Sequence, residues 1–231
     1  MNPELLMMVG VLGGGGAPFS PASISGLQLW YKADAITALN DGDPLATWTD
    51  QSGNGRNATQ ASATIKPLYK TNILNGMAGV LFDGVNDVMS IVYDMPATTS
   101  IFIVYSGWSS GSLIGNNGEA TDMIQRATTN FPDSNLLVIN TSQSMANNKI
   151  LTMLFNYTTD NYTIRMDGAS VGTSSAAANV TTPGAITIGQ SYNEPLAGYL
   201  HEVILYNAVL SAGDYAAVET YLASRWGVTL G

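Results

Sequence analysis

The sequence contains no cysteine and only one histidine among its 231 residues. Without cysteine the chain has no disulfide framework and no thiolate ligand or nucleophile, and a single histidine excludes the usual zinc sites. Any metal ion would therefore be held by oxygen atoms. The histidine, His201, alternates with Leu200 and Glu202 in the last expected strand, and it has no metal partner and no serine nucleophile at motif spacing, so we predict a hydrogen-bonded structural role.

Charged residues are also scarce, at 11%, and basic residues are the rarer kind. The 8 basic and 17 acidic residues give a net charge of −9, and the basic ones are scattered singly. Such a chain repels a phosphate backbone, so we expect no nucleic-acid partner. The surface must draw its hydrogen-bonding groups from Ser, Thr, Asn and Gly, which favours a β-rich fold with many loops.

Residues 1–25 begin with a short apolar run, and no basic residue precedes Lys32. The missing positive region does not match a secretory signal, and about 12 Å of helix is too short to span a membrane. An apolar peptide followed by four glycines is either a disordered terminus or an anchor that folds onto a partner. The anchoring residues would be Leu5, Leu6, Met7, Met8, Val9, Val11 and Leu12.

After residue 25 the chain consists of short alternating segments separated by turn residues, which is typical of a sandwich or barrel. Residues 27–32 alternate in polarity, whereas 101–106 and 149–156 are dense in apolar and β-branched residues, as buried strands are. Asp167-Gly168 predicts a hairpin with a type I′ turn. We expect roughly a dozen strands in all.

A single helix is expected near the C-terminus. Ser211 is placed as its N-cap with Asp214 three residues later, and Gly227 ends it. Four apolar residues at helical spacing should pack against the sandwich: Val218, Tyr221, Leu222 and Trp226. No repeat or linker follows residue 25, so residues 26–231 are expected to form one domain.

Taken in order, several segments resemble the concanavalin A-like lectin/glucanase superfamily. They include "GLQLWYKAD", "SGNGRNATQ", "LFDGVNDVMS", "IFIVYSG", "YTIRMDGASVG", "AITIG" and "GYLHEVILYN". The chain is most similar to the laminin-G-like jelly roll of bacterial surface and phage virion proteins, over about residues 26–230. The resemblance implies an all-β jelly-roll sandwich of two antiparallel sheets, whose concave face and rim loops commonly bind glycans.

Hydrolytic members of that superfamily carry two glutamates flanking an aspartate on one strand, so that the three carboxylates share a face. This sequence has no Glu-x-Asp-x-Glu. Its acidic groupings are Asp41 with Asp43, Asp83 with Asp87, and Glu202 alone in its strand. We therefore predict that the protein is not an enzyme.

Members of the superfamily often bind calcium near the sugar site, and the segment from Asp50 begins like a calcium-binding EF-hand loop. The twelfth position is Ala61 where that loop needs a bidentate carboxylate, so the EF-hand interpretation fails. Two interpretations remain. One is a tight turn through Gly53 and Gly55 whose amides are capped by side chains, which we favour. The other is a calcium site formed by Asp50, Ser52, Asn54 and the Arg56 carbonyl, with help from a distant carboxylate such as Asp34 or Asp87.

Trp108 lies between serines and glycines at an expected strand end, where an aromatic ring is placed to stack on a sugar. Tyr192 and Asn193 are its expected companions from another loop. The other three tryptophans fall at positions that should face the core: Trp30, Trp48 and Trp226.

These features lead to the hypothesis of a non-catalytic jelly roll displayed on the surface of a virion, as a bacteriophage head-decoration or tail-associated protein. Residues 1–25 would dock to a capsid or tail protein while residues 26–231 face outward, and a homo-oligomer is left open. The alternative is a secreted or cell-surface carbohydrate-binding module.

Overall fold

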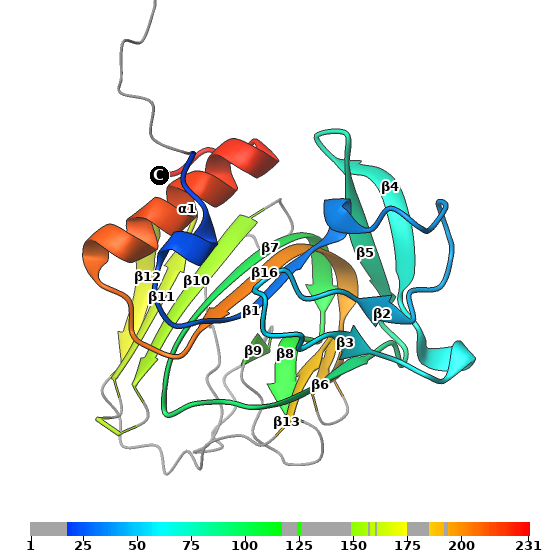
Figure 1. Ribbon diagram of the computed structural model, residues 1–231, viewed down its shortest axis with the longest axis horizontal. Helices are drawn as coiled ribbons and strands as arrows, with labels where there is room; N and C mark the ends of the chain where they lie inside the picture. The colour runs from blue at the N-terminus through cyan, green and yellow to red at the C-terminus, as the bar shows by residue number, and fades with distance from the viewer. Residues whose placement is uncertain are drawn as a thin grey trace, which may run out of the picture.

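A computed structural model describes residues 18–116, 124–125, 149–156, 158–159, 161–174, 185–191 and 194–231 (Figure 1). The anchoring residues predicted between Leu5 and Leu12 lie outside these ranges. The anchor and the boundary at residue 25 therefore stay predictions.

The described residues form sixteen strands, three short 3-10 helices and one α-helix. The strands are β1 Leu27–Lys32, β2 Thr47–Trp48, β3 Ala58–Thr59, β4 Leu68–Leu74, β5 Met77–Asp83, β6 Met89–Asp94, β7 Thr98–Ser110, β8 Ser112–Asn116, β9 Ile124–Gln125, β10 Lys149–Asn156, β11 Asn161–Met166, β12 Ala169–Ser174, β13 Ala185–Ile188, β14 Gln190–Ser191, β15 Glu194–Pro195 and β16 Ala197–Tyr206. The 3-10 helices are η1 Pro21–Ser23, η2 Ala33–Ala35 and η3 Ala63–Ile65, and the α-helix is α1 Ala212–Trp226.

Two large antiparallel sheets make up the sandwich, and β14 and β15 pair in a separate two-stranded sheet. The eight-stranded sheet runs β12-β11-β10-β7-β16-β5-β4, with β1 also paired to β16, and the six-stranded sheet runs β2-β3-β6-β13-β8-β9. The first half of β16 pairs with β5 and its second half with β1. The predicted all-β sandwich of two antiparallel sheets is confirmed.

The main core lies between the sheets, and strand alternation selects the residues that enter it. On β1, Leu29 and Tyr31 point inward, whereas Trp30 points to the outer face of the eight-stranded sheet. Trp48 is fully buried in the main core. The predicted core positions of Trp30, Trp48 and Trp226 are confirmed, although two different cores receive them.

The C-terminal helix covers part of the outer face of the eight-stranded sheet. Ser211 Oγ accepts the amide of Asp214 at 3.3 Å, and Gly227 ends the helix at φ 65°. Its buried stripe packs on outward-facing residues such as Phe102 and Ile204 in a second core. Figure 1 shows α1 lying over β10, β11 and β12, with β4 and β5 toward the opposite end of the sheet. In the described part of the chain, no helix is long and apolar enough to cross a membrane.

The hairpin between β11 and β12 also forms as predicted. Asp167 and Gly168 have φ values of 49° and 84°, the two positive angles that a type I′ turn requires. Asp167 Oδ1 further accepts the amide of Ile150 at 2.9 Å, which ties the turn to β10.

Candidate functional site

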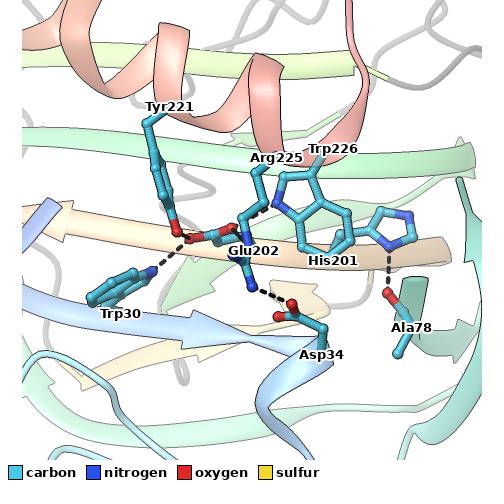
Figure 2. Close-up of polar contacts among 8 residues, drawn as sticks. All are labelled: Trp30, Asp34, Ala78, His201, Glu202, Tyr221, Arg225 and Trp226. Carbon is cyan, nitrogen blue, oxygen red and sulfur yellow. Dashed lines mark hydrogen bonds and ion pairs between the residues drawn. The ribbon is translucent and has the colours of Figure 1, made fainter. Parts of the chain in front are cut away.

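Glu202 of β16 is fully buried beneath the C-terminal helix (Figure 2). Its Oε1 accepts hydrogen bonds from Trp30 Nε1 at 2.6 Å and Tyr221 Oη at 3.1 Å, and its Oε2 accepts from Trp226 Nε1 at 2.6 Å. Burial raises the pKa of this carboxyl, and the donors oppose that rise. With three donors on a covered carboxylate, and Arg225 Nε 3.4 Å away, Glu202 joins the helix to the sheet and has no room for a substrate.

His201 is the neighbouring buried polar group. Its Nδ1 lies 2.9 Å from the Ala78 carbonyl, which can only accept, so Nδ1 carries the proton and Nε2 accepts from Ser106 Oγ at 2.8 Å. Burial lowers the pKa of His201 to about 4, so the ring is neutral at pH 7. The predicted hydrogen-bonded structural role is confirmed.

The Asp50 segment forms a tight turn. Asp50 Oδ1 accepts the amides of Trp30 and Ser52 at 3.0 and 2.9 Å. Its Oδ2 accepts the Arg56 amide at 3.0 Å and Ser52 Oγ at 2.7 Å. Asn57 Oδ1 accepts the Asp50 amide at 3.0 Å. These contacts are the capped turn, one of the two interpretations of this segment.

The residues of the alternative calcium set already take part in hydrogen bonds within the protein. Tyr31 Oη donates to the Arg56 carbonyl, and Asn54 Nδ2 donates to the Leu27 carbonyl at 3.0 Å. The distant carboxylates are engaged as well: Asp34 pairs with Arg225, and Asp87 accepts the Asp83 amide. Over the described residues, no group of three His, Asp or Glu side chains is placed to hold a metal ion.

Trp108 does not take the position predicted for a sugar ligand. It is 1% exposed, its Nε1 donates to the Gly111 carbonyl at 3.0 Å, and its ring packs edge-on against Tyr105 at 5.2 Å. Strand β7 extends through Ser110, so strand alternation carries Trp108 into the main core. The stacking prediction is therefore wrong for Trp108. Tyr192 and Asn193 lie outside the described residues.

Near β4, no described helix covers the outer face of the eight-stranded sheet, and we call this part the open face (Figure 1). Residues paired across three strands lie side by side on it: Leu68 of β4 opposes Leu81 of β5, which opposes Tyr199 of β16. All three are partly exposed. Asp83 ends β5 on the same face and is exposed.

Tyr199 lies between two glycines on the open face. A Cβ at Gly79 of β5 would be 3.5 Å from the Tyr199 ring, and a Cβ at Gly107 of β7 would be 3.6 Å from it. The His201 ring is nearly parallel to it, at 15° and 6.5 Å between centroids. Neither flanking strand therefore places a side chain beside the Tyr199 ring at Gly79 or Gly107, and Tyr199 is partly exposed.

Asp83 ends β5 at the open face, and Asp87 lies in the segment that follows β5. Asp83 Oδ1 accepts the Val85 amide at 2.8 Å, and Asp87 Oδ2 accepts the Asp83 amide at 3.0 Å. Asp87 is only 5% exposed, and burial raises its pKa to about 6. The Asp83 amide opposes this rise, while the Asp83 charge adds to it. The pair therefore joins an exposed carboxylate to a buried carboxyl that keeps its proton in mildly acidic solution.

A separate cavity of about 340 Å³ lies between the end of β1, the segment after η2, and β2. Ile36, Leu39 and Trp48 contribute apolar parts of its wall, and Lys32 and Gln51 contribute polar ones. None of the described residues that line it is acidic.

No protein-family model and no curated protein matches this chain. Solved structures do: an arabinofuranosidase complexed with arabinofuranosyl-alpha-1,2-xylobiose matches with a TM-score of 0.58 and 16% identity over 79% of this chain and 51% of that one. Trypanosoma rangeli sialidase in complex with sialic acid matches with a TM-score of 0.55 and 13% identity over 90% of this chain and 35% of that one. The chain thus spans about half of the first protein and a third of the second.

At 13–16% sequence identity, the likeness shows a shared β-sandwich fold and no more. The β-sandwich is also the fold that the sequence resemblance implied. It also corrects two expectations. The structures named above are glycosidases rather than virion proteins, so the non-catalytic bacteriophage decoration or tail protein has no support and is overturned. The prediction that the protein is not an enzyme is wrong for the same reason.

Proposed function

We propose that this chain is a carbohydrate-active domain that binds a glycan on the open face, over the ring of Tyr199. The observation that carries the proposal is the partly exposed Tyr199 ring set between Gly79 and Gly107. Its fold, which is that of glycoside hydrolases, supports the same class of ligand.

The chemistry of the open face suits a sugar ring. A pyranose or furanose has one face of C–H groups, which pack on an aromatic ring, and a rim of hydroxyls, which need hydrogen-bond partners. Tyr199 and Leu81 offer the apolar surface, and the exposed Asp83 carboxylate lies beside them as an acceptor. Arabinofuranosides and sialosides are the first ligands to test, because the structurally similar proteins are an arabinofuranosidase and a sialidase.

We expect Tyr199→Ala to weaken glycan binding roughly tenfold, since ring stacking contributes about 1–1.5 kcal/mol. Tyr199→Phe keeps the ring and should bind nearly as the parent does. Calorimetric titration of a glycan panel measures both, and Val92→Ala, at a residue 95% exposed on the other sheet, is the control. Equal binding by the alanine and phenylalanine variants would remove Tyr199 from the site.

A second candidate function is hydrolysis of a glycosidic bond, favoured by the raised pKa of Asp87. A glycosidase needs one protonated carboxyl to donate to the leaving oxygen and one carboxylate to attack the sugar or activate water. Asp87 is the candidate acid and Asp83 the candidate carboxylate. Burial of Asp87 keeps the proton in place, although it leaves only a small part of the side chain accessible.

We expect Asp87→Asn to lower kcat/KM by a factor of about 10² or more, the usual contribution of a general acid. Activity of the parent should fall as the pH rises through about 6, where Asp87 loses its proton. Initial rates on chromogenic glycosides between pH 4 and 8 measure both effects. Glycan binding without hydrolysis would reject the catalytic role of Asp87 and leave the binding surface standing.

The same titration predicts a change in stability that does not depend on catalysis. The folded state holds the Asp87 proton up to about pH 6, whereas the unfolded chain loses it near 3.8. The free energy of unfolding therefore falls as the pH rises between these values. The Asp87→Asn variant has no carboxyl proton to lose at this position, so its free energy of unfolding should not fall in this way. The difference in melting temperature, variant minus parent, should therefore increase from pH 4 to pH 7.

A further inference from the structure

The cavity near β2 has the size and shape of a ligand site that the open face does not use. Its volume of about 340 Å³ is at the lower end of the range for small-molecule pockets, which suits a ligand of one sugar ring. Ile36, Leu39 and Leu45 give it an apolar wall. The ligand must therefore be small and have an apolar face.

Among the described residues that line the cavity, Lys32 is the one that carries a charge, in a chain whose net charge is −9. Its Nζ lies 4.6 Å from the centroid of the Trp30 ring, and it forms no ion pair with any of the described residues. The carboxylates nearest in sequence are engaged elsewhere, Asp34 with Arg225 and Asp50 with its turn. Lys32 is thus a partly buried cation that has no carboxylate partner among the described residues.

The other polar groups in the wall include donors that suit the same ligand. Gln51 offers a side-chain amide, and Thr37, Thr47 and Thr49 offer hydroxyls. The indole N–H of Trp48 is buried without an acceptor in the described part of the structure, a condition that costs free energy. Because the Trp48 ring is covered, Lys32 and Gln51 are the donors that a ligand meets first.

We propose that this cavity binds a hexuronic acid, which is a single sugar ring that carries a carboxylate. The carboxylate pairs with Lys32, and the C–H face of the ring packs against Ile36 and Leu39. Since the described part of the wall contains Lys32 and no acidic residue, it favours an anion over a cation. The hydroxyl-bearing threonines distinguish a sugar acid from a simple aliphatic carboxylate. The inference stands apart from the proposed role of Tyr199, because it uses a different surface.

The test compares D-glucuronate with D-glucose, two sugars that differ in the group that should meet Lys32. Calorimetric titration of the full chain should give glucuronate at least tenfold tighter binding than glucose. Lys32→Met, which keeps the aliphatic stem, should lose at least tenfold in glucuronate affinity, whereas Lys32→Arg, which keeps the charge, should stay within about threefold of the parent. Added salt should weaken the interaction.

Three results would overturn the inference: equal affinity for glucose and glucuronate, unchanged glucuronate binding by Lys32→Met, or no saturable binding of either sugar by the folded parent. Tyr199→Ala separates the two proposals. It should leave glucuronate affinity unchanged while it lowers glycan binding on the open face. Failure of one site then says nothing against the other.

Discussion

Replacing Glu202 with alanine is expected to destabilise the fold by about 3–5 kcal/mol, the usual cost of breaking a buried charged network by removing one partner. The substitution leaves the indole N–H groups of Trp30 and Trp226 buried without an acceptor, and it takes the partner from Tyr221. It also leaves a cavity between the helix and the sheet. Chemical denaturation at pH 7 measures the change.

Two variants make this result specific. Glu202→Gln keeps the side-chain volume and one acceptor oxygen but turns an amide NH₂ toward one of the donors, so its loss should be intermediate. Asp41→Asn weakens the exposed ion pair with Lys70 and should change stability little. If Glu202→Ala unfolds at the same denaturant concentration as the parent, the network in Figure 2 does not hold the helix to the sheet.

Features fixed by neighbouring residues could be predicted from the sequence. The helix begins at Ser211 and ends at Gly227 because its caps are local contacts, with the Asp214 amide at one end and a positive φ at the other. The Asp167-Gly168 turn is local in the same sense. Alternation placed the strands and their buried residues, since it needs no knowledge of pairing.

Features that depend on strand register could not be predicted. Gly79 and Gly107 reach the sides of Tyr199 only because β5 and β7 pair with β16 on either side of it. The donors to Glu202 likewise come from residue 30 and from the helix. Trp108 was misplaced because β7 continues past the serines and glycines that suggested a loop. The candidate site combines such nonlocal contacts, whereas the fold class follows from local ones.

The prediction that the protein is not an enzyme rested on the absence of one sequence pattern. The absence of Glu-x-Asp-x-Glu excludes one arrangement, three carboxylates on one face of a single strand. A β-sandwich can bring acidic residues together in other ways. Asp83 and Asp87 lie across a turn from each other. Burial of Asp87, together with the charge of Asp83, raises the pKa of Asp87. The sequence shows that Asp83 and Asp87 are close along the chain, but it does not show that Asp87 is buried and that its pKa is raised.

Gly189→Ala is expected to destabilise the fold by about 2–5 kcal/mol, because two costs coincide at this position. Gly189 has φ +87°, a conformation that costs an alanine about 1–2 kcal/mol. A Cβ there would also lie 2.1 Å from two carbons of the Phe82 ring, which is 1% exposed in the main core. Moving that ring disturbs close packing, at roughly 1–3 kcal/mol.

Gly42→Ala separates these costs. Gly42 has φ +88°, nearly the same as Gly189, but a Cβ there would have nothing within 4 Å. Its loss should be the backbone strain alone, so the difference between the two variants in urea denaturation measures the collision with Phe82. In a Phe82→Ala background, Gly189→Ala should cost no more than Gly42→Ala does. Equal losses in the parent background would mean that the Phe82 ring moves aside freely and that the main core is loosely packed between β5 and β13.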